Sequence, residues 1–210
     1  MEHVLKNVIT ILSGVRLTPL IALMLLCSNR HIVWADLDRW GYFRLGQPRN
    51  LMERILLFVN LMTWEPQYRN VFYHRTGLQG KLLSILCRPM ASLGLHRRTK
   101  IGPGLKIFHG DGTHVSAVEI GKNCTIFQQV TIGFARTKRP PIIGNNVIVY
   151  AGAKILGEVK VGDNAIIAAN SLVISDVPPN VTVMGVPAFV VWCAERQQLQ
   201  NDSDHVASKV

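Results

Sequence analysis

Two histidines stand close together near the middle of the chain, in the segment IFHGDGTH between residues 107 and 114. His109 is followed by a glycine, which leaves room for substrates. An imidazole is the side chain best matched to take a proton from an alcohol near neutral pH. Asp111, between two glycines, suits either the orientation of an imidazole or the capping of a turn. His109 is therefore a candidate general base, although the residues alone describe an idle, exposed histidine equally well.

The other potentially reactive side chains offer less chemistry. His114 could contact an acceptor, pair with a neighbour or have no role. The four cysteines lie far apart without a CxxC pair, which predicts reduced thiols and neither a disulfide framework nor a zinc site. A metal-dependent hydratase needs three converging imidazoles, and the segment around His109 supplies only two. We therefore predict no metal, and a hydratase stays as one alternative.

The positive charge is concentrated in the first half of the chain. The 210 residues carry a formal net charge of +10, and residues 1–100 hold 14 Lys and Arg against 5 Asp and Glu, a net of +9. A basic segment with long apolar runs suits an anionic membrane surface or an anionic substrate. No nucleic-acid-binding motif accompanies the charge, so we predict no nucleic-acid partner. The apolar run from Leu17 to Cys27 has about half the length that spans a bilayer and predicts a buried or interfacial helix.

The two halves of the chain differ in period. Up to residue 98 apolar residues recur at helical spacing, as at Leu51, Ile55 and Val59. From residue 101 the period is six, because Ile or Val begins successive hexads and the fifth place is small or branched. A period of six is typical of a parallel β-helix, in which each hexad forms one side of a three-sided coil. We predict a mainly β fold, with a helical region over residues 1–98, a left-handed parallel β-helix over residues 99–192 and a tail over residues 193–210.

Two breaks in the hexads predict loops, which carry function more often than the coils do. One extra residue lies between Thr113 and Ile120, directly after the histidine pair, and five lie between Ile132 and Ile143 in a basic stretch. Cys124 occupies the fifth place of its hexad, which is an inward corner. We therefore predict a buried structural thiol there and no nucleophile.

These motifs resemble those of the hexapeptide-repeat acyltransferases, whose members fold as left-handed parallel β-helices. IFHGDG is similar to the segment that holds the catalytic histidine of this family, and CTIFQQVTIG and VIVYAGAKILGEVKVGDNAIIAANSLVISDVPPNVTVMGVPA are similar to the coils that follow. The branch most similar comprises the serine acetyltransferases and the polysaccharide O-acetyltransferases that resemble them. The similarity covers about residues 99–192, and EPQYRNVFYHRTG resembles the N-terminal segment of the capsule and exopolysaccharide members.

The resemblance implies an acetyl-CoA-dependent O-acetyltransferase that works as a homotrimer, with each site between two neighbouring β-helices. It assigns His109 the deprotonation of an acceptor hydroxyl, which attacks the thioester without an acyl-enzyme, and Asp111 is the second catalytic candidate. Small residues let pantetheine approach the backbone, and basic side chains suit CoA phosphates or an anionic acceptor. The predicted cofactor-binding residues are Gly133, Arg136, Lys138, Ala151, Gly152 and Ala169, and the predicted acceptor-binding residues are Phe108, His114 and Arg139.

Some positions depart from the pattern of the serine acetyltransferases. Phe108 and Gly94 stand where that branch has aspartates, and Lys138 with Arg139 stand where it has an Arg-His pair. An aromatic ring beside the catalytic histidine suits the C–H face of a sugar better than a zwitterion. We therefore expect the acceptor to be a sugar hydroxyl of a surface-polysaccharide intermediate, acetylated in the cytoplasm or at the inner face of the membrane. Serine O-acetylation and a non-catalytic trimeric scaffold are the alternatives.

Overall fold

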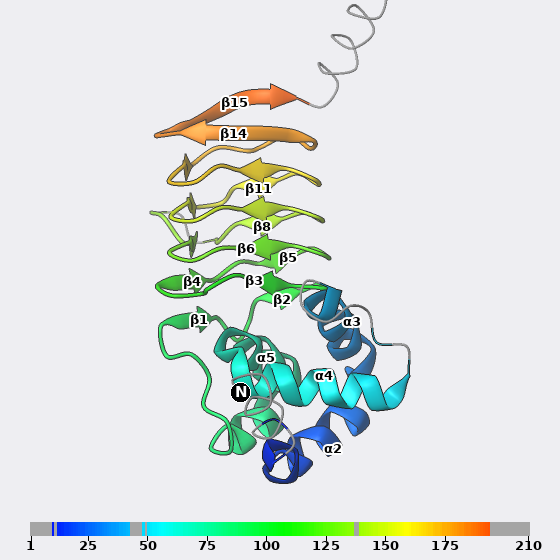
Figure 1. Cartoon of the computed structure of the whole chain (residues 1–210). Helices are drawn as coiled ribbons and strands as arrows, with labels where there is room; N and C mark the ends of the chain where they lie inside the picture. The colour runs from blue at the N-terminus through cyan, green and yellow to red at the C-terminus, as the bar shows by residue number, and fades with distance from the viewer. Residues whose placement is uncertain (1–9, 11, 43–47, 49, 137–138, 194–210) are drawn as a thin grey trace, which may run out of the picture.

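A column of short strands stands on a group of helices in the computed structural model (Figure 1). The structure describes the whole chain except residues 1–9, 11, 43–47, 49, 137–138 and 194–210. Lys138 and nearly all of the predicted tail therefore lie outside the described residues. The helices form the N-terminal end of the molecule, and the chain then climbs the column coil by coil.

Among the described residues, the N-terminal region is built around an aromatic core by the helices α2 (Thr18–Leu26), α3 (Arg30–Tyr42), α4 (Leu51–Trp64) and α5 (Pro66–Leu83). The side chain of Asn50 caps α4 by accepting a hydrogen bond from the Glu53 amide at 2.9 Å, and a proline opens α5. The buried rings of Trp40 and Phe58 meet the ring of Tyr68 edge to face, at centroid distances of 5.3 and 6.3 Å.

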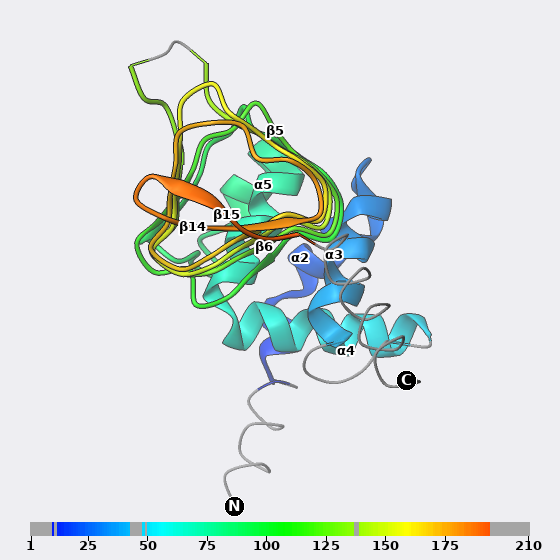
Figure 2. The same cartoon turned by 90° about the horizontal axis from the view of Figure 1, so that it is seen from above.

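The rest of the described chain is a parallel β-helix, as the hexads predict. Seen from above, the coils superimpose into a three-sided outline, and each side is a sheet (Figure 2). One side contains β1 (Leu93–Leu95), β4 (Thr113–Val115), β7 (Thr131–Gly133), β10 (Lys154–Leu156) and β13 (Leu172–Val173). The second contains β2 (Lys100–Ile101), β5 (Glu119–Ile120), β8 (Ile142–Ile143) and β11 (Lys160–Val161). The third contains β3 (Lys106–Ile107), β6 (Thr125–Ile126), β9 (Ile148–Val149), β12 (Ile166–Ile167), β14 (Val181–Gly185) and β15 (Ala188–Cys193), of which the last pair is antiparallel.

The period of six has its origin in the core of the β-helix. The residues that begin the hexads stack in register, so that Ile107 pairs with Ile126, and Ile126 with Val149, with all three buried. The fifth place lies at a tight inward corner, where Cys124 is 1% exposed. Burial raises the pKa of the Cys124 thiol to about 11, so the predicted structural thiol stays protonated near neutral pH.

A buried ion pair joins the helices to the first coil. Arg75 on α5 donates from Nε to Asp36 Oδ2 on α3 at 2.8 Å, and the two side chains are 5% and 2% exposed. The other carboxylate oxygen of Asp36 accepts hydrogen bonds from the amides of Gly104 and Leu105, at 2.7 and 3.1 Å. Trp40 also donates from its indole nitrogen to the Leu105 carbonyl at 2.8 Å. The helical region is thus fixed against the coil that leads directly into His109.

Candidate functional site

His109 occupies an exposed turn at the end of β3. Its backbone is left-handed, with φ of 63°, and the Gly110 amide donates to the Phe108 carbonyl at 2.7 Å, which closes a three-residue γ-turn centred on His109. Most other non-glycine residues with positive φ are asparagines, which tolerate this conformation well. Among the described residues with positive φ, His109 and Gln129 are the two that are neither glycine nor asparagine. Strained backbone of this kind gathers at functional sites, which supports His109 as the catalytic residue.

Three of the residues predicted for the cofactor, Ala151, Gly152 and Ala169, continue the corner that begins at His109, whereas Gly133 and Arg136 lie at the corner between β7 (Thr131–Gly133) and β8 (Ile142–Ile143). The strands of this side are in register, so the third places of successive hexads stack as His109, Gln128, Ala151 and Ala169. Gly152 follows Ala151 with φ of 75°, and its amide donates to the Gln128 carbonyl at 3.0 Å. A side-chain carbon at Gly152 would come within 2.0 Å of Asn170 Oδ1. The corner therefore stays shallow from Gln128 upward, as a long, thin pantetheine chain requires.

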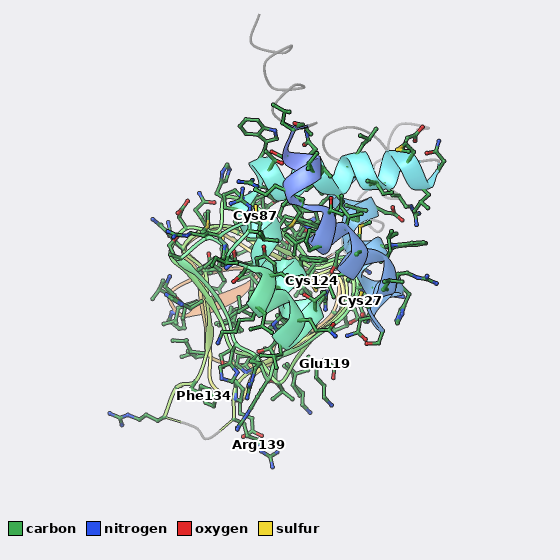
Figure 3. All side chains as sticks on the ribbon, turned by 90° about the horizontal axis from the view of Figure 1, so that it is seen from below. Cys27, Cys87, Glu119, Cys124, Phe134 and Arg139 are labelled. Carbon is green, nitrogen blue, oxygen red and sulfur yellow. The ribbon has the colours of Figure 1, made fainter. Side chains whose placement is uncertain are left out.

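The basic loop lies at a different corner from His109. The chain leaves β7 at Gly133 and returns at β8, whereas His109 joins β3 to β4. Phe134 and Arg139 project from this loop, away from the helices (Figure 3). Arg136 and Arg139 are exposed, and Arg139 Nη1 lies 3.5 Å from Glu158 Oε1. Within one chain the structure thus does not bring the loop to His109.

The helical region closes one side of the His109 turn. A side-chain carbon at Gly110 would lie 3.1 Å from Met90 Sδ, and 3.3 Å from both Gln67 Cβ and Leu93 Cδ2. Gln67 in turn donates from its amide to the carboxylate of Glu65 at the start of α5. Spacing along the chain gave no signal for these contacts, because they join segments more than 15 residues from His109.

His114 fills the space above Gly94. The two residues face each other in the register between β1 and β4, and a side-chain carbon at Gly94 would come within 2.8 Å of His114 Nδ1. An aspartate at position 94 therefore does not fit while His114 keeps this position. The glycine at position 94, where the resemblance leads one to expect an aspartate, and the ring of His114 thus go together, because the ring occupies the space that an aspartate side chain would need.

Asp111 has a partner on the segment before β1. Ser92 donates from Oγ to Asp111 Oδ1 at 3.0 Å, and the Gln129 amide donates to the Asp111 carbonyl at 2.8 Å. These contacts hold the His109 turn in place from both sides. Orientation of the imidazole by Asp111 stays a prediction.

Three aromatic rings form a ladder beside the His109 corner. Phe108 stacks on Phe127 with centroids 5.0 Å apart and planes 19° apart, and Phe127 stacks on Tyr150 at 5.1 Å and 22°. Lys106 Nζ lies 5.0 Å from the Phe108 centroid. The sequence contained the signal, because all three rings occupy the second place of their hexads, but only Phe108 was predicted as a site residue.

The described residues contain no group of three His, Cys, Asp or Glu side chains that could hold a metal ion. In the same part of the chain no single helix has the length and apolar composition of a membrane span. The one pair of helices that together reach this length and apolar composition is α2 and α3, which are bent by 117° relative to each other.

Comparison with known proteins shows which transferases this chain is similar to. Residues 140–175, in the upper coils of the β-helix, match the family model of the bacterial transferase hexapeptide (six repeats). A serine acetyltransferase of Staphylococcus epidermidis is 37% identical over 163 residues, which cover 75% of this chain and 76% of the relative. One of Synechococcus elongatus is 38% identical over 126 residues, and the match spans only 52% of that relative.

Solved structures agree with these relatives. The serine acetyltransferase of Neisseria gonorrhoeae superimposes with a TM-score of 0.64 at 29% identity, over 82% of this chain and 68% of the other. A serine acetyltransferase in complex with CoA gives 0.59 at 29% identity, over 81% and 72%. The chain belongs to the serine acetyltransferase family. The prediction of a hexapeptide-repeat acyltransferase with a helical N-terminal region is therefore confirmed, and the members of this family are acyltransferases that use acetyl-CoA.

Proposed function

We propose that the protein transfers the acetyl group of acetyl-CoA to the hydroxyl of serine, with His109 as the general base. One observation carries the proposal: the similarity to serine acetyltransferases spans 75% of the chain and so includes helices as well as coils. The acceptor that we predicted from the sequence, a sugar, was the less well supported of the two alternatives.

The proposed chemistry is a direct transfer. His109 takes the hydroxyl proton while the serine oxygen attacks the carbonyl carbon of the thioester. The carbon–sulfur bond then breaks, the acetyl group remains on oxygen as an ester, and protonated His109 returns its proton to the CoA sulfur. No acyl-enzyme forms, and Cys124 is buried and protonated, which supports a route without a cysteine nucleophile.

Glu65 is the acidic residue that we expect to bind the serine ammonium group. Its carboxylate accepts a hydrogen bond from the Gln67 side chain, and Gln67 packs against Gly110 beside the catalytic histidine. A carboxylate near the ammonium group stabilises the bound zwitterion.

The basic loop supports a homotrimer. Arg136 and Arg139 lie at another corner than His109 within one chain, and we infer that a neighbouring copy presents them to the site. There they would bind the serine carboxylate or the CoA phosphates. The trimer is tested by light scattering at micromolar concentration, and a monomeric mass would contradict both the trimer and the shared site.

A sugar hydroxyl is the second candidate acceptor, because of the ladder of Phe108, Phe127 and Tyr150. Its rings form an apolar strip next to His109, which suits the C–H face of a sugar.

CoA release measured with serine, with simple sugars and with nucleotide-linked sugars distinguishes the two candidate acceptors. The matched variants are Glu65→Gln and Phe108→Ala. If serine is the acceptor, Glu65→Gln raises the KM for serine roughly ten- to hundredfold, since a charge-assisted hydrogen bond is worth roughly 1.5–3 kcal/mol. Turnover of a sugar without any turnover of serine would reject the serine proposal.

We propose that the enzyme lies in the cytoplasm and contacts anionic lipid through the C-terminal ends of α2 and α5. Leu26, Leu82 and Ile85 are 83%, 70% and 81% exposed there, and residues 66–110 contain no Asp or Glu. Apolar side chains among cations suit an anionic bilayer, whereas two such surfaces would repel each other. Co-sedimentation with phosphatidylglycerol vesicles, but not phosphatidylcholine vesicles, is expected, and Leu26→Glu with Ile85→Glu should abolish it. Equal sedimentation of wild type and variant would contradict this contact.

A further inference from the structure

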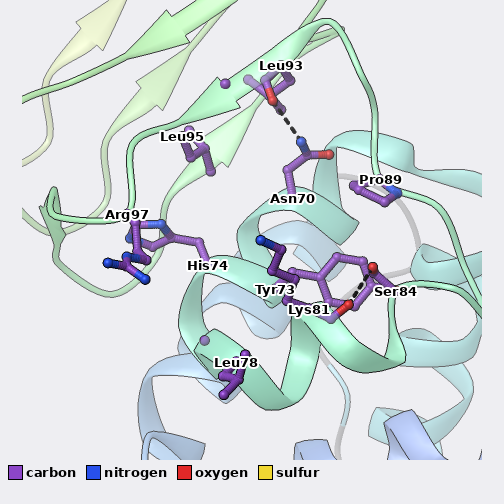
Figure 4. A pocket seen from close by; sticks show the side chains of 12 residues that line it. Asn70, Tyr73, His74, Leu78, Lys81, Ser84, Pro89, Leu93, Leu95 and Arg97 are labelled. Atoms are coloured by element: carbon purple, nitrogen blue, oxygen red, sulfur yellow. Dashed lines mark hydrogen bonds between the residues drawn. The ribbon is translucent and has the colours of Figure 1, made fainter.

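A pocket of about 460 Å³ lies between α5 and β1, one coil below the catalytic turn (Figure 4). Helix α5 supplies one wall, and β1 with the residues after it supplies the other. Its volume is within the usual range for small-ligand sites. Several lining residues belong to the segment EPQYRNVFYHRTG, and the proposed transfer reaction does not use the pocket.

The neutral polar groups of this pocket are already satisfied within the protein. Asn70 donates to the Leu93 carbonyl at 2.9 Å, Tyr73 donates to the Cys87 carbonyl at 2.6 Å, and Ser84 donates to the Lys81 carbonyl at 2.7 Å. The bonds of Asn70 and Tyr73 fix the shape of the pocket, because α5 and the segment that leads into β1 cannot separate without breaking them.

His74 contributes a neutral ring. Its Nε2 lies 3.1 Å from the Thr99 carbonyl, and since a carbonyl only accepts, Nε2 carries the proton. Burial lowers the pKa of His74, and the positive charge of Arg75 lowers it further. The ring therefore leaves Nδ1 as an acceptor for a ligand hydroxyl.

The pocket contains two cations that have no partner among the described residues. Lys81 and Arg97 line it from opposite walls, and the structure gives neither side chain a hydrogen bond or an ion pair within the described residues. No acidic residue lines the pocket, and none lies anywhere between residues 66 and 110. Two unpaired cations in a shaped pocket attract a group that carries up to two negative charges, and the guanidinium fork of arginine matches phosphate in particular.

The remaining lining is apolar and connects to the catalytic turn. Leu78, Pro89 and Leu95 form apolar walls around the cations, so the ligand needs an apolar part beside its charge. Leu93 also packs against Gly110, and Gly94 packs against His114. A ligand in the pocket would therefore contact Leu93 and Gly94, which in turn pack against the residues on either side of the catalytic turn.

We propose that this pocket binds a phosphorylated ligand with an apolar portion, with Lys81 and Arg97 on the phosphate. The ligand is either the phosphate-bearing part of a nucleotide-linked sugar, if the second candidate acceptor is the true one, or a separate effector, and both share this chemistry. The binding itself does not depend on the proposed acetyl transfer.

Calorimetric titration of the full chain with phenyl phosphate tests the proposal, with saturating CoA present so that the donor groove is filled. Phenyl phosphate should bind at least tenfold more tightly than inorganic phosphate, because the ring fills the apolar walls. Lys81→Gln and Arg97→Gln should each weaken it about tenfold. Arg98→Gln is the matched control, since it removes the same charge from an exposed neighbour that does not line the pocket. Circular dichroism establishes that the variants are folded.

Equal affinity in wild type and in the Lys81→Gln, Arg97→Gln double variant would overturn the proposal, and so would an equal loss in Arg98→Gln. Activity assays then distinguish the two sources of the ligand. Competition of phenyl phosphate with the acceptor indicates that the phosphate belongs to the acceptor, and a changed kcat without competition indicates an effector. An enzyme that binds phenyl phosphate but acetylates neither serine nor a sugar would reject the proposed function and leave the pocket proposal standing.

Discussion

The β-helix and the helical region of this protein hold their residues in place by different means. In the β-helix each residue is supported by its equivalent on the next coil, as Ile107 is by Ile126 and Val149. In the helical region each contact is made once, as in the pair of Asp36 and Arg75. A repeat gives a rigid scaffold on which one strained turn, at His109, can be maintained. The contacts of the helical region do not repeat, and they place Gln67 and Met90 against Gly110 in the turn.

The largest effect is expected from His109→Ala. Loss of a general base lowers kcat by roughly a hundred- to ten-thousandfold. CoA binding should persist, because the small residues Ala151, Gly152 and Ala169 that form the corner above are unchanged. The measurement is steady-state CoA release together with CoA titration, and His96→Ala is the control for an exposed histidine of the first coil. Near-normal turnover in His109→Ala would refute the assignment.

Asp36→Ala separates the two regions. It leaves Arg75 buried without its partner, and removal of one member of a buried pair costs about 3–5 kcal/mol. We expect the free energy of unfolding of the helical region to fall by that amount, while the β-helix keeps its own transition. Urea unfolding is followed by the near-ultraviolet signal of the tryptophans, of which Trp34, Trp40 and Trp64 lie in the helical region, and by the far-ultraviolet signal of the whole fold. A first transition in the near-ultraviolet signal that precedes the loss of the remaining far-ultraviolet signal reports the helical region. The control is Asp38→Ala, whose pair with Arg54 is partly exposed, and a loss of equal size there would contradict the special role of the Asp36 pair.

Gly94→Ala tests the coupling between the first coil and the second. The added carbon would meet His114 Nδ1 at 2.8 Å, and overpacking of this kind costs about 1–3 kcal/mol. The double variant with His114→Ala should recover most of the loss, because the ring that causes the overlap is gone. Thermal unfolding of the four members of the cycle gives the coupling energy. Additive effects of the two substitutions would show that they do not interact.

The smallest effect is a pH dependence at the contact between α5 and the Thr99 carbonyl. The pKa of His74 is lowered in the folded protein, so the unfolded chain takes up its proton first as the pH falls through about 6.5. Stability from His74 is therefore complete above that pH and is lost as the pH falls towards the lowered folded value. Urea unfolding at pH 7.5 and 5.5 should show a smaller loss in His74→Gln than in the wild type. An unchanged difference would assign the pH dependence to other groups.

Much of the β-helix was predictable because its cause is periodic. Ile or Val at the first place and a small residue at the fifth repeat often enough to predict the coils, the loops between them and the buried Cys124. The position of His109 at an exposed turn followed from the same register. The first coil was harder to recognise: β1 pairs with β4 from Leu93 onward, before the residue at which the hexads become regular.

The sequence by itself determined what the repeat places in register, which comprises the β-helix, the His109 corner and the small residues stacked above it. Only the tertiary structure decided what lies against that corner. Gln67 and Met90 reach Gly110, His114 takes the space above Gly94, and Lys81 and Arg97 line one pocket from separate segments. The physical reason is that periodic burial is written locally into every coil, whereas a contact made once between distant segments depends on how the helices pack against the first coil.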